Sequence, residues 1–198
     1  MGIAEARTEQ DRRSDLLAAA DRVIRRRGPD ASMDEIATEA GVTKPILYRH
    51  FGDKDGLYAA LVERFLEALY AAADETLAET NPRRRIAAAV ASFLAAVEAE
   101  PQVFHFVRRA TTEQRQAAEV AGAFITAHAG RIANATRPDL ERIGADPSSA
   151  EPFAHGIVGM FQFVAAWWLD TRAVPREQLV DDMTTLLWEG FGHLHESR

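Results

Sequence analysis

The 198-residue chain contains no cysteine, which excludes a disulfide framework, a thiolate nucleophile and a zinc site built on cysteine. It has no apolar run long enough to cross a bilayer, since the best candidate, residues 156–169, has only the length of a buried helix. Residues 1–15 are polar and charged, unlike a secretory signal. These absences predict a cytoplasmic protein with no membrane partner.

An overall excess of basic residues, the usual mark of a nucleic-acid-binding chain, is also missing, because the formal net charge is −7. The distribution of charge matters more than the sum. Basic and acidic residues nearly balance in residues 1–56, whereas acidic residues clearly outnumber basic ones in the rest. The only two lysines, Lys44 and Lys54, fall in one short stretch, which is suggestive but also fits an arginine-rich codon bias.

Enzyme motifs are absent as well: the chain has no HExxH, no P-loop and no GxGxxG. Glu151 and His155 lie four residues apart, which is not the Glu-x-x-His spacing of di-iron bundles. His193 and His195 fall near the chain end, where a solvated tail is the plainer interpretation. We therefore expect neither an enzyme nor a cofactor or metal site.

Apolar residues recur at helical spacing along the chain, and no segment shows sustained period-two alternation. This pattern predicts an all-α fold of about nine helices, the first over about residues 12–27. We expect an N-terminal three-helix domain, residues 1–56, and a C-terminal helical domain, residues 57–198. Five later helix starts are marked by prolines, which are tolerated in a first turn: Pro45, Pro82, Pro101, Pro147 and Pro175.

Two short helices are predicted around a tight turn near residue 41. Ser32 followed by Glu35 forms a capping box that starts the first of them. Gly41 ends that helix in a left-handed conformation, and Thr43 caps the next one. A preceding helix, a short helix and a second helix after such a turn make a helix-turn-helix.

The second of these helices is predicted to be anchored on one side and bare on the other. Leu47 and Phe51 lie four residues apart and face inward. The other face offers a cation, hydroxyls and an arginine fork, which suit base edges and phosphate oxygens in a major groove about 12 Å wide. That face carries Thr43, Lys44, Pro45, Tyr48 and Arg49.

The segment from Ser32 to Leu57, above all the run Ala-Gly-Val-Thr-Lys-Pro-Ile-Leu-Tyr-Arg-His-Phe, closely resembles the DNA-binding domain of the TetR/AcrR family of bacterial transcriptional regulators. The resemblance covers about residues 12–65. Asp34 departs from it, because some relatives carry a basic or polar DNA-contacting residue there. The resemblance implies base reading by Thr43, Lys44, Pro45 and Arg49, and phosphate contacts by Ser32, Tyr48, His50 and Lys54.

In the C-terminal domain the resemblance is one of layout. It implies that the last two helices pair with a second copy of the chain in a four-helix bundle, although part of their apolar surface also suits an ordinary core. The residues expected at this homodimer interface are Ile157, Met160, Phe161, Val164, Trp168, Leu179, Met183, Leu187 and Phe191.

The resemblance also implies a ligand pocket among the fourth to eighth helices. We expect a largely apolar effector, such as a fatty-acyl compound, with His105, Arg108 and Arg109 near a mouth to hold an acidic end group. An aromatic cluster at helical spacing is more often plain core than a pocket. The pocket candidates are Phe65, Phe93, Phe104, Phe106, Phe124, His128, Phe163 and Trp167.

These expectations combine into one hypothesis: a repressor that binds a palindromic operator in double-stranded DNA as a homodimer and is released by a small-molecule effector. Three alternatives remain open at this point. The regulator could be an activator, it could require its ligand to bind DNA, or the fold could serve only protein contacts.

Overall fold

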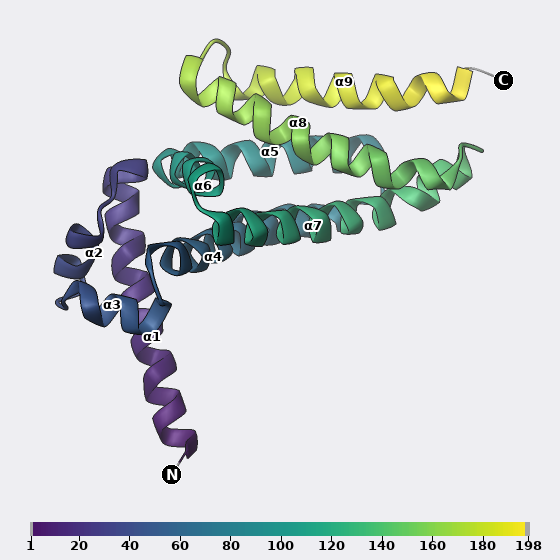
Figure 1. The fold of residues 1–198 in the computed structure, drawn as a ribbon. Helices are drawn as coiled ribbons and strands as arrows, with labels where there is room; N and C mark the ends of the chain where they lie inside the picture. Colours follow the sequence, from purple (N-terminus) through teal and green to yellow (C-terminus); the bar gives the residue numbers. More distant parts are fainter. Residues whose placement is uncertain (1, 197–198) are drawn as a thin grey trace. The chain divides into compact units, whose positions relative to one another are not determined.

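The computed structural model describes the backbone of residues 2–196 and the side chains of residues 9–190. Within these residues the chain is all-α without strands, as predicted (Figure 1). The α-helices are α1 (Gly2–Arg27), α2 (Met33–Glu39), α3 (Lys44–Phe51), α4 (Lys54–Asp74), α5 (Pro82–Ala99), α6 (Pro101–Glu113), α7 (Arg115–Arg142), α8 (Ala150–Thr171) and α9 (Arg176–Glu196). Short 3-10 helices are η1 (Gly28–Asp30), η2 (Glu75–Ala78) and η3 (Pro147–Ser149). No single helix in this part of the chain is long and apolar enough to span a membrane.

The chain forms two compact units. The first comprises Met1–Leu66 and Glu100–Gly122, and the second Glu67–Ala99 and Ala123–Arg198. The first unit is larger than the predicted N-terminal domain because side chains after residue 56 pack into it. The Tyr58 hydroxyl donates to the Ala31 carbonyl at 3.0 Å, and its ring meets Phe106 of α6 edge-on, with centroids 4.9 Å apart.

Helix α1 supplies the spine of the first unit. Its buried stripe begins at Leu16 and continues through Ala20, Val23 and Ile24, each at most 1% exposed. The stripe packs against α2 and α6. The helix begins at Gly2, well before the predicted start near residue 12. The earlier start was not predicted because residues 2–11 have no apolar periodicity that could reveal it.

In the second unit, α5 packs against both α8 and α9, which run antiparallel (Figure 1). The turn between them is fixed by Trp168, which is 1% exposed. Its indole N–H donates to the Val174 carbonyl at 2.9 Å, and the Arg172 guanidinium lies 4.3 Å from its ring centroid. Arg172 itself adopts a left-handed conformation, with φ 47°.

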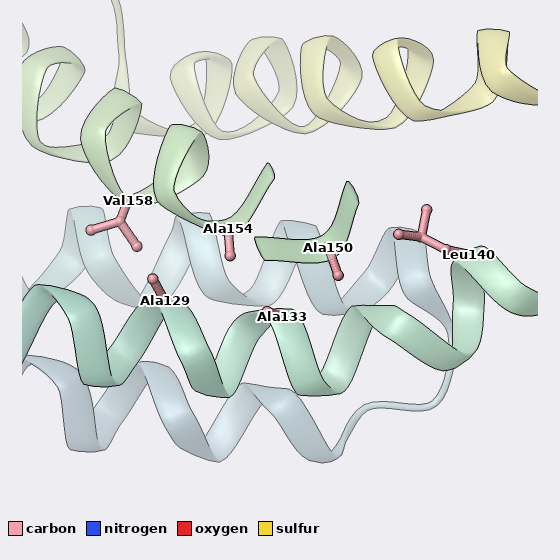
Figure 2. Close-up of a cluster of buried hydrophobic side chains, with 6 residues drawn as sticks. All are labelled: Ala129, Ala133, Leu140, Ala150, Ala154 and Val158. Carbon is pink, nitrogen blue, oxygen red and sulfur yellow. The ribbon is translucent and has the colours of Figure 1, made fainter. Parts of the chain in front are cut away.

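Small side chains join α7 and α8 (Figure 2). Ala129 and Ala133 of α7 face Ala150 and Ala154 of α8, and all four are at most 1% exposed. Because alanine carries a single methyl group, it lets the two helix backbones approach closely at native packing density. We call this contact the alanine seam. Helix α7 runs through Pro138 to Arg142 without a gap.

Replacing Ala133 by leucine is expected to lower the free energy of unfolding by about 1–3 kcal/mol, because extra methylene groups in a filled seam force side chains off their rotamers. Ala127→Leu makes the same change at an exposed site of α7 and is expected to stay within about 0.5 kcal/mol of the parent. Urea unfolding at one protein concentration measures both. Equal losses for the two variants would contradict a tightly packed seam.

Candidate DNA-reading face and ligand cavity

The turn between α2 and α3 is built as the sequence predicts. The Ser32 hydroxyl accepts from the Glu35 N–H at 3.2 Å, and Glu35 in turn accepts from the Ser32 N–H at 3.0 Å. Gly41 takes the expected left-handed conformation, with φ 64°. Thr43 has the extended conformation of an N-cap, but its hydroxyl makes no capping bond. The capping box thus fixes the start of α2, while the Thr43 side chain does not cap α3.

The end of α3 is fixed by a close approach to the start of α4. The Gly56 N–H donates to the Asp53 carboxylate at 2.8 Å. A Cβ at Gly56 would lie 2.1 Å from the Phe51 carbonyl oxygen, so only glycine fits there. This contact sets the first turn of α4, where Lys54 lies exposed with its ammonium 4.9 Å from the Tyr58 ring centroid.

Helix α3 has one buried side and one bare side. Leu47 is fully buried, and Phe51 is half-buried with the Arg13 guanidinium 4.9 Å from its ring centroid. Tyr48 is 36% exposed, a high value for a tyrosine with no functional need for water contact. The bare side consists of Thr43, Pro45, Tyr48 and Arg49, with the half-buried Lys44 beside them. We call this surface the α3 face.

Lys44 is paired within the chain. Its ammonium lies 2.8 Å from the Asp34 carboxylate, and this hydrogen bond raises the pKa of Lys44 above its ordinary value. Asp34 is the residue at which the sequence departs from the family pattern. The carboxylate therefore offsets much of the Lys44 charge in the absence of DNA, while the ammonium keeps further N–H donors for another acceptor.

Two other predicted phosphate ligands are less free than the α3 face. The Ser32 hydroxyl is held by Glu35, to which it also donates at 2.9 Å. His50 is half-buried, and its Nε2 is shielded from solvent without a hydrogen-bond partner among the described residues. A phosphate contact by His50 would therefore have to come from the other ring nitrogen or follow a rotation of the ring.

The second unit encloses a cavity of about 500 Å³, within the range of small-molecule sites. Its wall is mostly apolar, and Phe93 of α5 meets Phe161 of α8 across it, with ring centroids 5.4 Å apart. The apolar lining consists of Ala73, Leu77, Pro82, Ile86, Ala89, Phe93, Ile132, Leu140, Ile143, Ile157, Val158, Phe161, Leu187 and Trp188.

One part of the wall carries a stacked aromatic pair. The rings of Tyr70 and His128 are 4.3 Å apart and nearly parallel. Burial lowers the pKa of His128, against the opposing effect of Asp74, whose carboxylate lies 3.0 Å from Nδ1 but out of line with a proper hydrogen bond. Burial also raises the pKa of Tyr70, and a hydrogen bond with Gln162 partly offsets this. At neutral pH both rings are therefore uncharged.

Only Phe93 and His128 of the predicted ligand residues line this cavity. Phe65 and Phe106 form part of the core of the first unit, where their ring centroids lie 6.2 Å apart. Phe104 and Phe124 are half-buried outside the cavity wall. Phe163 and Trp167 project outward and are 79% and 47% exposed.

Sequence reasoning missed several wall residues, notably Tyr70, Phe161, Gln162 and Trp188. The available signal was the spacing on α8, where Val158, Phe161 and Gln162 share one side of the helix. Arg108 and Arg109 are not among the residues that line the cavity; they lie on α6 in the first unit, where both are exposed. Arg109 pairs there with Glu113 at 2.8 Å and Asp30 at 3.4 Å.

The residues expected at a homodimer interface are also divided by the structure. Trp168, Leu179 and Met183 are buried inside the second unit. Ile157, Phe161 and Leu187 line the cavity, Met160 and Val164 are half-buried, and the side chain of Phe191 lies outside the described ones. Among the described side chains, the large apolar ones that α8 and α9 leave exposed are Phe163, Trp167, Leu186 and Trp188.

A helix-turn-helix with a bare recognition helix and a separate cavity-bearing helical unit define a class: a DNA-binding regulator of bacterial type. Residues 16–61 match the family model described as bacterial regulatory proteins of the tetR family. Residues 68–198 match the model of a tetracyclin repressor-like C-terminal domain. The chain belongs to the TetR family of transcriptional regulators, which is not a family of enzymes.

Individual relatives agree with this assignment. The HTH-type transcriptional activator FasR of Mycolicibacterium smegmatis is 33% identical over 193 residues, covering 95% of this chain and 86% of its own. An uncharacterised HTH-type transcriptional regulator of Mycobacterium tuberculosis is 30% identical over 183 residues, covering 90% of this chain and 76% of its own. The transcriptional regulator FadR of Bacillus subtilis, solved with stearoyl-CoA, shares the fold with a TM-score of 0.72 at 13% identity, covering 88% of this chain and 96% of its own.

Proposed function

We propose that this regulator is a homodimeric repressor that binds a palindromic operator through the α3 face and is released when a largely apolar small molecule enters the cavity of the second unit. The observation that carries the proposal is the arrangement of α3. Leu47 is completely buried and holds the helix, while Tyr48 and Arg49 on the other side are exposed. A helix held in this way can enter a major groove without unfolding its support.

Within this proposal, side chains on the α3 face read bases and flanking groups hold the DNA backbone. Arg49 and Lys44 can donate to guanine, and the Thr43 methyl group and Pro45 can contact thymine. Tyr48 and Lys54 contact phosphates, and Lys54 does so from the first turn of α4, where the helix dipole favours an anion. Ser32 and His50 are secondary phosphate ligands, because Glu35 holds one of them and burial limits the other.

A second copy of this chain is the proposed occupant of the exposed apolar surface on α8 and α9. The exposed apolar side chains include Phe163 and Trp167 of α8 and Leu186 of α9, of which Phe163 and Leu186 are 79% and 64% exposed. Large apolar side chains left this exposed are costly in a monomer and typical of an interface. A dimer also presents two α3 helices, as a palindromic operator requires.

The proposed effector is a fatty-acyl or similarly lipophilic compound. Two observations support it: the cavity wall is overwhelmingly apolar, and FadR, which has the same fold, holds stearoyl-CoA. Ligand binding lowers operator affinity only to the extent that the ligand prefers the conformation that does not fit DNA. A specific observation also favours a second candidate mode, because the relative FasR is an activator.

The experiment has three stages. Selection from random duplexes identifies the sequence bound by the purified chain, and gel shift at two salt concentrations tests for specific, salt-sensitive retardation. The gel shift is then repeated with acyl compounds chosen by thermal stabilisation of the chain. Run-off transcription with the selected site placed over or upstream of a promoter separates repression from activation. A chain that selects no sequence would refute the proposal.

A further inference from the structure

One part of the cavity wall carries a cluster of charged side chains. Arg85 of α5 pairs with Asp139 of α7, and Arg142, one turn further along α7, contacts the same carboxylate at 2.7 Å. Arg85 also donates to the Glu79 carbonyl at 3.1 Å. Arg85, Asp139 and Arg142 all line the cavity, and we call them the basic corner.

The basic corner has an unbalanced charge. Two guanidinium groups share one carboxylate, which leaves one positive charge in excess. The side chains of Arg85 and Asp139 are only 14% and 17% exposed, while that of Arg142 is 65% exposed. Charges in a partly desolvated wall interact more strongly than charges in water, so the excess attracts an anion more effectively there than on the open surface.

The rest of the cavity has no comparable charge. The other titratable wall side chains, Tyr70 and His128, are both neutral at neutral pH. His128 lies on the same helix as Asp139, eleven residues away, which corresponds to about 16 Å at the helical rise. Between them α7 lines the wall with Ile132 and the uncharged Thr136, and the rest of the wall is mostly apolar. The cavity therefore combines a long apolar body with one basic end.

We infer that the basic corner is a subsite for the anionic end group of an amphiphile whose chain fills the apolar part of the cavity. Arg85 and Arg142 bind the anion, and planar guanidinium groups suit bidentate pairing with a carboxylate or a phosphate. Asp139 positions both arginines in the absence of the ligand. This inference rests on the proposed function, because it names the chemistry of the effector that controls DNA release.

The test uses four probes with one chain length: tetradecanoate, its coenzyme A thioester, tetradecanol and tetradecyltrimethylammonium. Calorimetry on the full chain without DNA measures their affinity. Tetradecanoate is expected to bind roughly 10- to 100-fold more tightly than the alcohol, the range of a charge-assisted hydrogen bond, and the cation most weakly. If replacing Arg142 weakens binding of the thioester but not of tetradecanoate, the anion recognised is a phosphate. If it weakens binding of tetradecanoate but not of the thioester, the anion recognised is a terminal carboxylate.

Arg142→Ala is the diagnostic variant, because Arg142 is exposed enough to be removed without emptying the core. It is expected to abolish most of the preference for an anion over the alcohol. Arg137→Ala is the matched control, since Arg137 lies on the same helix outside the cavity wall and pairs with Asn134. Asp139→Asn removes the competing carboxylate and is expected to tighten anion binding if it folds.

If neither tetradecanoate nor its coenzyme A thioester bound more tightly than the alcohol, or if the two arginine variants had equal effects, the inference would be overturned. Both outcomes are measured without DNA, so they leave the proposed function standing. A parent chain that binds no operator would overturn the proposed function instead, and selection and gel shift detect this separately.

Discussion

Replacing Lys44 and Tyr48 together by alanine is expected to weaken operator binding at least about 30-fold, equivalent to about 2 kcal/mol. The two side chains lie on the α3 face, one offering a cation and the other a hydroxyl with a broad apolar surface. Neither supports the core, so the free energy of unfolding should change by about 0.5 kcal/mol or less. Quantitative gel shift on the selected operator, with thermal unfolding in parallel, measures both quantities.

The matched control is Arg108→Ala, which also removes one positive charge from an exposed site of the first unit but lies on α6. If the α3 face binds DNA, the double variant should lose affinity and some salt dependence, since each lost phosphate contact reduces the slope by about one unit. The control should do neither. An unchanged operator affinity in the double variant would remove the basis of the proposed function.

The Asp34–Lys44 pair explains why the residues of the α3 face are expected to contribute unequally to operator affinity. From the sequence, Asp34 was only a departure from the family pattern. In the structure its carboxylate lies 2.8 Å from the Lys44 ammonium. On DNA binding, Lys44 therefore either breaks this ion pair or keeps it and contacts DNA with its remaining N–H groups. An exposed pair of this kind contributes little to stability. Arg49 and Tyr48 have no ion-pair partner among the described side chains and are expected to contribute more of the binding free energy.

Local chemistry explains which parts of the fold could be predicted. The capping box at Ser32, the left-handed Gly41 and the proline at the start of α3 act within a few residues, so their signals are readable in order along the chain. The buried stripe of α1 from Leu16 was readable for the same reason. The start of α1 was not, because a polar helix without an apolar stripe leaves no periodic trace.

The faces of α8 could not be assigned from periodicity, because large apolar residues occur all around the helix. Size suggested that Phe163 and Trp167 are interior, yet the alanine seam fills the interior with small residues such as Ala154. Phe161, expected at the dimer interface, instead meets Phe93 across the cavity. Only the tertiary packing decides which aromatic faces which neighbour.

The basic corner was missed for a related reason. The sequence favoured Arg108 and Arg109 as the acid-binding group, because they are close in sequence to several aromatic residues. The arginines that line the cavity are Arg85 and Arg142, brought together from α5 and α7 by their shared contact with Asp139. The spacing of residues along the sequence does not indicate which side chains of separate helices come into contact.

Replacing Phe163 by glutamate is expected to convert the proposed dimer into a monomer, with a rise in the dissociation constant of at least about 100-fold. Phe163 is 79% exposed on α8, which is unfavourable for a phenylalanine unless another molecule covers it. A carboxylate buried in that contact without a partner costs several kcal/mol, which exceeds the roughly 2.7 kcal/mol that a 100-fold change requires. Sedimentation velocity over a concentration series measures the effect.

The charge-matched control is Gln178→Glu, which places a carboxylate at an exposed polar position of α9 and should leave the assembly unchanged. The Phe163 variant should also lose specific operator binding, although its α3 face is untouched, because one recognition helix contacts only one half-site. Loss of operator binding with an intact α3 face would show that dimerisation is needed for binding in addition to the α3 face. A Phe163 variant that stays dimeric, or a monomer that keeps full operator affinity, would show that α8 does not hold the two copies together for DNA reading.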